Sequence, residues 1–329
     1  MARGFDKYVF IAPGSDYGHA MWSDLEDNSD CIFLNYPIET QNSILKTCHH
    51  IHFSFGINKV ISLPFKGIWK KFNSLEKIEF KDELKYCIIL PDVSACRMEV
   101  KYLEELGRRK NVEIVLINVN VVGKKKKLLD ERAHCFTKIF SFDRKDCEKY
   151  GYIYHPTIYS RPNLIKEYTV SSDAFFVGSY TPERYKKLVQ LHESITKNKG
   201  KTDFHIIGVP RSEKRIIGIE YNHQMNYSEV IRRSLSSNCV VEIMNPGQTG
   251  LTLRAMEAVC LNKKLVTDNR SVSELDYYSK GFVQIIDQVD SIDIDFILRR
   301  EQVDYEYRDD FSPNQLIKHI EMEYRGANK

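Results

Sequence analysis

Short, nearly continuous runs of apolar residues alternate with amphipathic segments along most of the chain. In the first half, these runs predict strands at residues 7–12, 31–35, 59–64, 84–90, 112–118, 138–141 and 152–155. Between two of them, Val100, Leu103 and Leu106 recur among charged neighbours, which predicts a helix over residues 97–109. Strands that are apolar on both faces are typical of parallel sheets covered by helices, so the pattern predicts an α/β fold.

A second α/β series follows a predicted linker at residues 161–163. Its strands are predicted at residues 174–177, 204–207, 239–244, 265–267 and 282–286, and its helices at 183–197, 227–236 and 250–261. Ser312 and Pro313 open a last helix in the manner of a capping box with proline at the first helical position. Leu316, Ile320 and Tyr324 lie on one face of that helix. We therefore predict two doubly wound domains, at residues 1–162 and 163–311, and a C-terminal helix at 312–329.

The composition is that of an ordinary globular protein. The 329 residues are 42% hydrophobic and carry a net charge of only +3, so we expect two real cores and no general attraction to nucleic acid. The eight cysteines form no CxxC pair, which favours reduced thiols. The first apolar run is too short for a secretion signal, and no uncharged apolar stretch reaches the ~18 residues that span a bilayer. We expect a cytoplasmic protein, either soluble or peripheral at the inner face of the membrane.

The strand predicted at 239–244 runs into a turn rich in glycine and threonine that opens a helix. Helix N-termini bind anions, and glycines let the backbone approach a phosphate. The candidate phosphate-binding residues are Gly247, Thr249, Gly250, Thr252 and Arg254. Glu257 lies one turn further along the same face, where a carboxylate suits a ribose diol. The alternative interpretation is a capped helix with an Arg254–Glu257 surface pair.

A second glycine turn favours the phosphate interpretation. Gly178 and Ser179 end the first predicted strand of the second domain, where doubly wound domains commonly receive a phosphate. No GxGxxG and no GxxxxGK[ST] motif is present, so neither a dinucleotide fingerprint nor a P-loop is indicated.

Residues 173–270 resemble the donor-binding domain of GT-B glycosyltransferases, above all those of bacterial lipopolysaccharide and capsule clusters. The resemblance rests on residues 176–180, on Gly247 to Glu257 and on residues 263–269. It implies two Rossmann-like domains facing across a cleft, with a nucleotide-sugar in the second, an acceptor in the first, and a C-terminal helix that can cross back to the first. By this resemblance Glu257 holds the ribose, and Gly178, Thr252 and Arg254 line the diphosphate.

The sequence departs from many retaining members of that family, which carry two glutamates eight positions apart. Thr249 stands eight positions before Glu257, which favours an inverting reaction that uses a general base. Asp16 and His19, after the first predicted strand, are the candidate bases, and Asp92 is a third. The alternative is that Asp16 caps a helix and His19 is solvated. Because a helix N-terminus and Arg254 would stabilise the leaving diphosphate, we expect no metal requirement.

Three further motifs have competing interpretations. Cys48, His50 and His52 alternate and could meet a metal if extended, or they line an acceptor cleft. The acidic pair at 293 and 295 resembles a metal–diphosphate motif but is better explained by helix capping or a solvated loop. Basic residues mixed with aromatics at 65–72, and four lysines at 124–127, suit either an anionic membrane surface or a solvated face.

Together these features predict an inverting, metal-independent glycosyltransferase that moves a sugar from a nucleoside diphosphate to a glycan hydroxyl, on an acceptor that can be lipid-linked. A sugar-nucleotide epimerase, a phosphoglycerol transferase and a non-catalytic nucleotide-sugar or glycan-binding subunit remain open. No nucleic-acid partner is expected.

Overall fold

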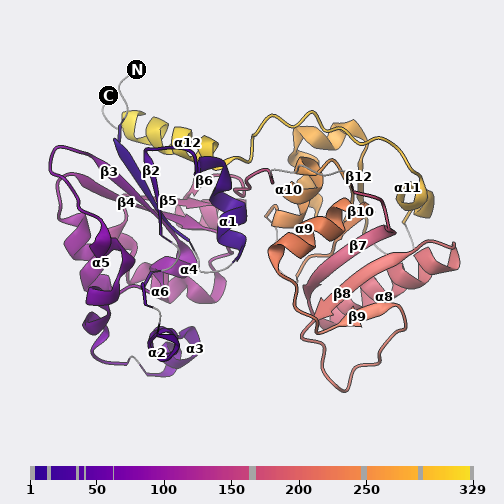
Figure 1. The fold of residues 1–329 in the computed structure, drawn as a ribbon, viewed down its shortest axis with the longest axis horizontal. Coiled ribbons are helices and arrows are strands. Elements are labelled where there is room, and N and C mark those ends of the chain that lie inside the picture. Colours follow the sequence, from indigo (N-terminus) through magenta and orange to yellow (C-terminus); the bar gives the residue numbers. More distant parts are fainter. Residues whose placement is uncertain are drawn as a thin grey trace. The chain divides into compact units, whose positions relative to one another are not determined.

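The computed structural model describes residues 4–12, 16–34, 37–40, 42–61, 63–162, 168–245, 250–287 and 292–326, without the side chains of residues 16, 17, 19, 55, 59, 60 and 124. The chain divides into two compact units (Figure 1). One comprises Met1–Ser160 together with Ser312–Lys329, and the other comprises Arg161–Phe311. The C-terminal helix thus belongs to the first unit.

Within the described residues, the first unit contains a parallel sheet of six strands in the order β2-β1-β3-β4-β5-β6. The chain passes from β1 to the edge strand β2 and then returns to the other side of β1, so the strand order switches between β1 and β3. The strands are β1 (Lys7–Ile11), β2 (Cys31–Leu34), β3 (Tyr86–Pro91), β4 (Val112–Asn118), β5 (Lys138–Ser141) and β6 (Ile153–Tyr154).

Helices cover both faces of this sheet. One core gathers strand residues such as Ile88 and Leu116 with Leu103 of α5, and the other gathers Phe10 and Ile89 with Trp22 of α1. The α-helices are α1 (Asp16–Trp22), α2 (Ser43–His52), α3 (Phe55–Val60), α4 (Asp92–Ala95), α5 (Val100–Gly107), α6 (Lys126–Asp130), α7 (Arg144–Tyr150) and α12 (Pro313–Gly326). The 3₁₀-helices are η1 (Ser23–Leu25), η2 (Lys66–Phe72), η3 (Ser74–Lys77), η4 (Gly123–Lys125) and η5 (Ala133–Cys135).

The terminal helix α12 packs on the second of these cores. Leu316 and Ile320 are fully buried there, and Tyr324 packs against it, as its apolar face predicts. Glu321 accepts hydrogen bonds from the backbone N–H of Gly4 and from the Tyr8 hydroxyl. These contacts join α12 to β1 and to the segment just before it (Figure 1).

The second unit repeats the doubly wound arrangement. Its described strands form a parallel sheet in the order β12-β11-β10-β7-β8-β9, so the strand order switches between β7 and β10. The strands are β7 (Ser172–Ser179), β8 (Thr202–Ile207), β9 (Ile219–Tyr221), β10 (Ser237–Glu242), β11 (Lys264–Thr267) and β12 (Val283–Ile285).

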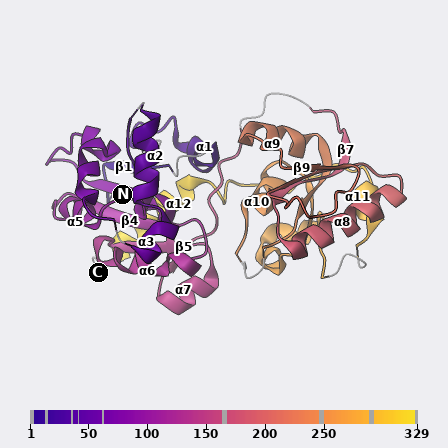
Figure 2. The same cartoon turned by 90° about the horizontal axis from the view of Figure 1, so that it is seen from below.

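The second sheet is also covered on both faces. Leu188 and Leu191 of α8 and Ile297 of α11 pack on one face, and Figure 2 shows α9 on the opposite side from α8. The helices are α8 (Pro182–Lys197), α9 (Tyr227–Leu235), α10 (Leu253–Cys260), α11 (Ile294–Leu298), η6 (Arg270–Glu274) and η7 (Asp276–Lys280).

The predicted α/β class with two doubly wound domains is confirmed, with two local exceptions. The described part of residues 59–64, predicted as a strand, joins no sheet; α3 ends at Val60, and Ile61 is 62% exposed. These described residues have no neighbouring strand with which to pair. The short strand β9 escaped prediction because three residues carry too little pattern. None of the helices in the described part of the chain is long and apolar enough to cross a membrane.

Candidate functional site

The carboxyl ends of β7 and β10 are neighbours in the second sheet, at its switch point. Ligands of open α/β sheets bind at such edges. The Arg184 guanidinium, from α8, joins the two strand ends: Nε donates to the Ile243 carbonyl at 2.8 Å and Nη1 to the Ser179 carbonyl at 2.9 Å. Arg184 is 8% exposed, and burial lowers its pKa. The positive charge of Arg184 therefore lies between the carboxyl ends of β7 and β10.

Gly178 permits this close packing at the end of β7. A Cβ atom at this position would lie 2.8 Å from Cζ of Phe176 and 3.4 Å from Nη1 of Arg184. Any side chain would displace one of them. Ser179, the next residue, ends β7 with an exposed side chain.

The N-terminus of α10 is tied to the sheet beneath it by a buried carboxyl group. Thr252 is the N-cap: its Oγ1 accepts the Arg254 N–H at 3.1 Å and donates to Oε1 of Glu242. The other oxygen of Glu242 accepts the Thr267 hydroxyl. Burial raises the pKa of Glu242, against the opposing effect of the two hydroxyl donors. The predicted phosphate-binding hydroxyl of Thr252 is thus already engaged in positioning the helix.

Glu257 lies one turn into α10 and is 2% exposed. Its Oε1 accepts a hydrogen bond from the Tyr227 hydroxyl at 2.9 Å, and its Oε2 pairs with Nη1 of Arg254. Burial raises the pKa of Glu257, while Arg254 and Tyr227 oppose that shift. The Arg254–Glu257 pair exists, but it joins a half-buried arginine to a buried carboxylate with a third partner, unlike the surface pair of the alternative interpretation.

A second ion pair lies beside the loop after β10. Asp268 accepts the Met244 backbone N–H at 2.7 Å and pairs with Nζ of Lys187, from α8, at 2.6 Å. Asn269 is 3% exposed and donates from Nδ2 to the Gly250 carbonyl at 3.2 Å. The segment after β11 therefore contacts both described ends of the loop between β10 and α10.

The predicted donor-site residues fall into two groups. Gly178, Ser179, Gly250, Thr252, Arg254 and Glu257 lie along the ends of β7 and β10 and the first turns of α10. Gly247 and Thr249 lie outside the described residues. The structure adds Tyr227, Glu242, Arg184 and Lys187 to this neighbourhood. Of these four, only Arg184 and Lys187 could have been found from the sequence. They are basic and stand three positions apart, on one face of the helix that follows Gly178.

The candidate bases belong to the first unit. Asp16 and His19 lie in α1, directly after β1, but their side chains are not among those described. Asp92 lies at the end of β3 and is fully buried; its carboxylate pairs with Lys125 Nζ at 2.5 Å and accepts the Val119 N–H at 3.3 Å. These contacts join β3 to the segment after β4.

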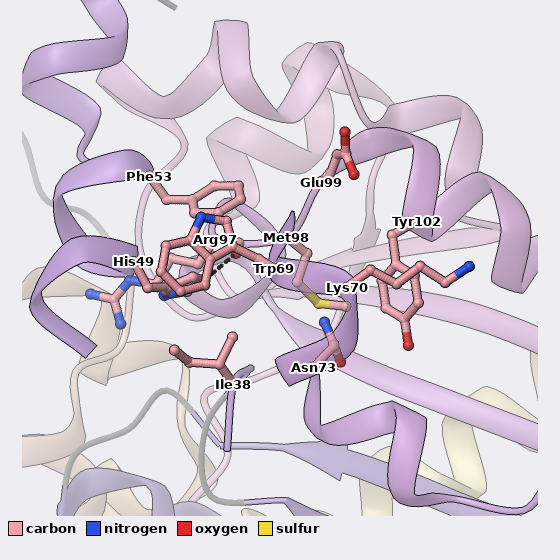
Figure 3. Close-up of a pocket in the computed structure, with 10 residues that line it drawn as sticks. All are labelled: Ile38, His49, Phe53, Trp69, Lys70, Asn73, Arg97, Met98, Glu99 and Tyr102. Carbon is pink, nitrogen blue, oxygen red and sulfur yellow. Dashed lines mark hydrogen bonds between the residues drawn. The ribbon is translucent and has the colours of Figure 1, made fainter. Parts of the chain in front are cut away.

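The histidine segment is helical, which makes the extended metal arrangement wrong. Cys48, His50 and His52 lie on α2, and no group of three or more potential metal-ligating residues occurs among the described side chains. His49 lines a small pocket instead (Figure 3), where its Nε2 lies 3.1 Å from the Arg97 carbonyl oxygen. Asp293 caps α11 by accepting the Asp295 N–H at 3.0 Å, in agreement with the capping interpretation.

Comparisons with known proteins support the fold. No family model matches the chain, and no curated protein matches it. Among solved structures, the chain is similar to apo OtsA, at 11% identity and a TM-score of 0.52 over 98% of this chain and 99% of that one. T4 phage BGT in complex with its UDP-glucose substrate is 11% identical with a TM-score of 0.42, over 98% of both chains. TarM is 16% identical with a TM-score of 0.44, over 68% of this chain and 49% of that one. This chain therefore spans about half the length of TarM. The chain thus has the two-domain α/β GT-B fold, an architecture of glycosyltransferases.

Proposed function

We propose that this chain is a glycosyltransferase whose second unit binds a nucleoside diphosphate sugar at the ends of β7 and β10. The observation that carries the proposal is the buried Glu257 carboxylate, held by Tyr227 and Arg254 one turn into α10. A buried charge is costly unless it is paired, and such groups concentrate at functional sites.

The ribose is the natural partner of Glu257. A carboxylate offers about four acceptor positions, of which Tyr227 and Arg254 occupy one on each oxygen. Each oxygen can therefore accept one more hydrogen bond, and a ribose diol supplies two adjacent donors. Tyr227 and Arg254 fix the direction of the carboxylate before the nucleotide arrives.

The diphosphate is expected at the N-terminus of α10. Free backbone N–H groups and the helix dipole favour an anion there. The guanidinium groups of Arg254 and Arg184 bring positive charge to the same sheet edge. These groups would stabilise the charge that develops on the leaving diphosphate, so we propose a reaction that needs no divalent metal.

We further propose that the sugar is transferred with inversion to a hydroxyl of a glycan in bacterial surface polysaccharide assembly, on an acceptor that is lipid-linked. Thr249 occupies the position where many retaining members carry the first of their two glutamates, which favours inversion. Asp16 or His19 would then remove the proton of the attacking hydroxyl. Replacing Asp16 by Asn or His19 by Gln should lower kcat without changing donor affinity, and NMR of the product should show the inverted anomer.

A thermal-shift panel tests the donor assignment first. The protein is heated with UDP, GDP, CDP, CMP, dTDP, NAD or ATP, with and without EDTA. A nucleotide at a hundred times its Kd adds about 2.7 kcal/mol of stability. We expect one nucleoside diphosphate to raise Tm in both conditions, and its sugar conjugate to release that diphosphate slowly in water. Stabilisation by NAD or ATP alone would contradict the proposal. Binding without release, even with a glycan mixture present, would instead indicate a binding subunit.

A further inference from the structure

The helix α2 exposes both of its isoleucines. Ile44 and Ile51, two turns apart on one face, are 70% and 46% exposed, and Cys48 between them is also exposed. The side chain that α2 buries is His49, at 1% exposure. This is the reverse of a surface helix on a soluble core, in which the apolar stripe faces inward.

The buried side chain of His49 is surrounded by aromatic rings. The His49 ring packs on those of Phe53 and Trp69, with centroids 4.8 and 5.0 Å away (Figure 3). Burial lowers the pKa of His49 to about 4, so the ring is neutral at physiological pH. His52 accepts the Trp69 indole N–H at 2.8 Å. These contacts fix the orientation of α2, so the exposure of its apolar stripe is built into the fold.

The segments that follow α2 in the chain also expose apolar side chains. Among the described residues, six of the eleven exposed large apolar side chains lie between positions 44 and 68: Ile44, Ile51, Ile57, Ile61, Phe65 and Ile68. Phe65 has a left-handed backbone conformation, with φ of 61°, and its ring is 79% exposed. That conformation is unfavourable for a bulky residue and gains nothing from packing in the free protein.

The same segment is strongly basic. Residues 40–72 contain five lysines and neither aspartate nor glutamate, a charge of +5 in a chain whose total is +3, so the remainder carries −2. Lys46 and Lys71 are exposed. Lys70 differs, because it pairs with Glu105 of α5. The positive charge of the chain is therefore concentrated where its exposed apolar side chains lie.

We propose that Ile44, Ile51, Ile61 and Phe65, with Lys46 and Lys71, form a docking surface for an anionic phospholipid bilayer. Apolar side chains of such surfaces enter the boundary between headgroups and acyl chains, and lysines are attracted to anionic lipid. The pocket beneath holds about 10 Å³, room for a single water molecule, so it offers no groove for a protein side chain. A fluid bilayer requires none.

Vesicle sedimentation tests this docking independently of nucleotide binding. The full chain is spun with vesicles of phosphatidylglycerol and phosphatidylcholine, and with vesicles of phosphatidylcholine alone. We expect it to pellet with the anionic vesicles only, and less in 1 M salt, where the Debye length falls to about 3 Å. Retention in the supernatant with anionic vesicles at low salt would overturn the proposal, whatever the nucleotide measurements show.

Two variants separate the apolar and the electrostatic contributions. The double variant Ile44→Gln with Phe65→Asn removes exposed apolar area, and asparagine tolerates the left-handed backbone. We expect it to lose at least tenfold in vesicle affinity. Lys46→Gln with Lys71→Gln should lose about 30-fold, since each lysine near an anionic surface contributes about fivefold. Met322→Gln on α12, 62% exposed, is the matched control and should bind as the wild type does.

Two outcomes of these variants would contradict the account. Equal vesicle affinity of the Ile44/Phe65 variant and the wild type would mean that the apolar side chains do not enter the bilayer. Binding to soluble polyglutamate but not to anionic vesicles, lost in the Lys46/Lys71 variant, would assign the surface to an acidic protein instead. Circular dichroism of both variants should match the wild type and Tm should not fall, because all four side chains are exposed and asparagine tolerates the backbone conformation of Phe65.

Discussion

The hydroxyl of Tyr227, in the first turn of α9, donates a hydrogen bond to Oε1 of Glu257, in α10, at 2.9 Å. This bond joins two helices that follow different strands of the second sheet, and it orients a carboxylate that is 2% exposed. Since Arg254 pairs with the other carboxylate oxygen, Glu257 is held in one direction from both sides.

Replacing Tyr227 by phenylalanine tests this bond. The ring stays, but the buried carboxylate loses a donor, so we expect the free energy of unfolding to fall by about 1.5–3 kcal/mol, as for a hydrogen bond to a charged group. Urea unfolding measures the change. Tyr278→Phe removes a hydroxyl from a side chain that is 39% exposed and should change stability little. Equal losses in the two variants would show that the Tyr227 hydroxyl has no special role.

Glu242 should make stability depend on pH. Burial raises its pKa above the ordinary value of 4.5, so the folded protein binds the proton more tightly than the unfolded chain. The resulting stabilisation is complete below pH 4.5 and is lost as the pH rises through the pKa of the folded state. We therefore expect the stability of wild type relative to Glu242→Gln to decrease from pH 4.5 to 8 in urea unfolding. A constant difference would contradict a raised pKa.

His155 should act in the opposite direction. It is 5% exposed and lies 3.1 Å, Nδ1 to Nδ1, from His319 of α12; burial and the second ring lower its pKa to about 3. The unfolded chain takes up a proton near pH 6.5 and the folded protein does not, so stability is lost as the pH falls below 6.5. Relative to His155→Gln, wild type should lose about 2 kcal/mol between pH 6.5 and 5. If the His155→Gln variant follows the wild-type curve, the protonation of His155 does not oppose folding.

Gly178→Ala should destabilise the second unit. The added Cβ would stand 2.8 Å from Cζ of Phe176, a ring that is 3% exposed, so the ring or the strand must shift. Overpacking of this kind costs about 1–3 kcal/mol. Gly56→Ala, where the nearest atom to a new Cβ is 3.9 Å away, should be neutral or stabilising in the same urea titration. A neutral Gly178→Ala would show that the approach of Phe176 and Arg184 is easily relaxed.

Much of the fold could be predicted from the sequence because both sheets are buried on both faces. The strand at Val112–Asn118 was predicted to the residue, since every position but Glu113 is apolar or terminal. The same reasoning fails where an apolar residue is exposed: Ile61, in the segment predicted as a strand at residues 59–64, is 62% exposed and follows the end of α3. A pattern of apolar residues predicts a strand only where the fold buries those residues.

The candidate site was predictable in part. Glycines, threonines and Arg254 after a buried strand indicate an anion site by spacing alone. The roles of Tyr227 and Glu242 depend on contacts between segments 30 and 25 residues apart in the chain, which no local pattern encodes. Whether Asp16 or His19 serves as a base remains a prediction from sequence.

A double-mutant cycle on the ribose contact tests the central claim most directly. Calorimetry gives the Kd of the nucleoside diphosphate selected by the panel and of its 2′,3′-dideoxy analogue, for wild type, Glu257→Gln and the exposed control Glu220→Gln. We expect removal of the ribose hydroxyls to weaken binding to wild type and to Glu220→Gln by about 1–3 kcal/mol, and to cost Glu257→Gln much less. An equal loss in all three proteins would place the ribose away from Glu257 and contradict the account.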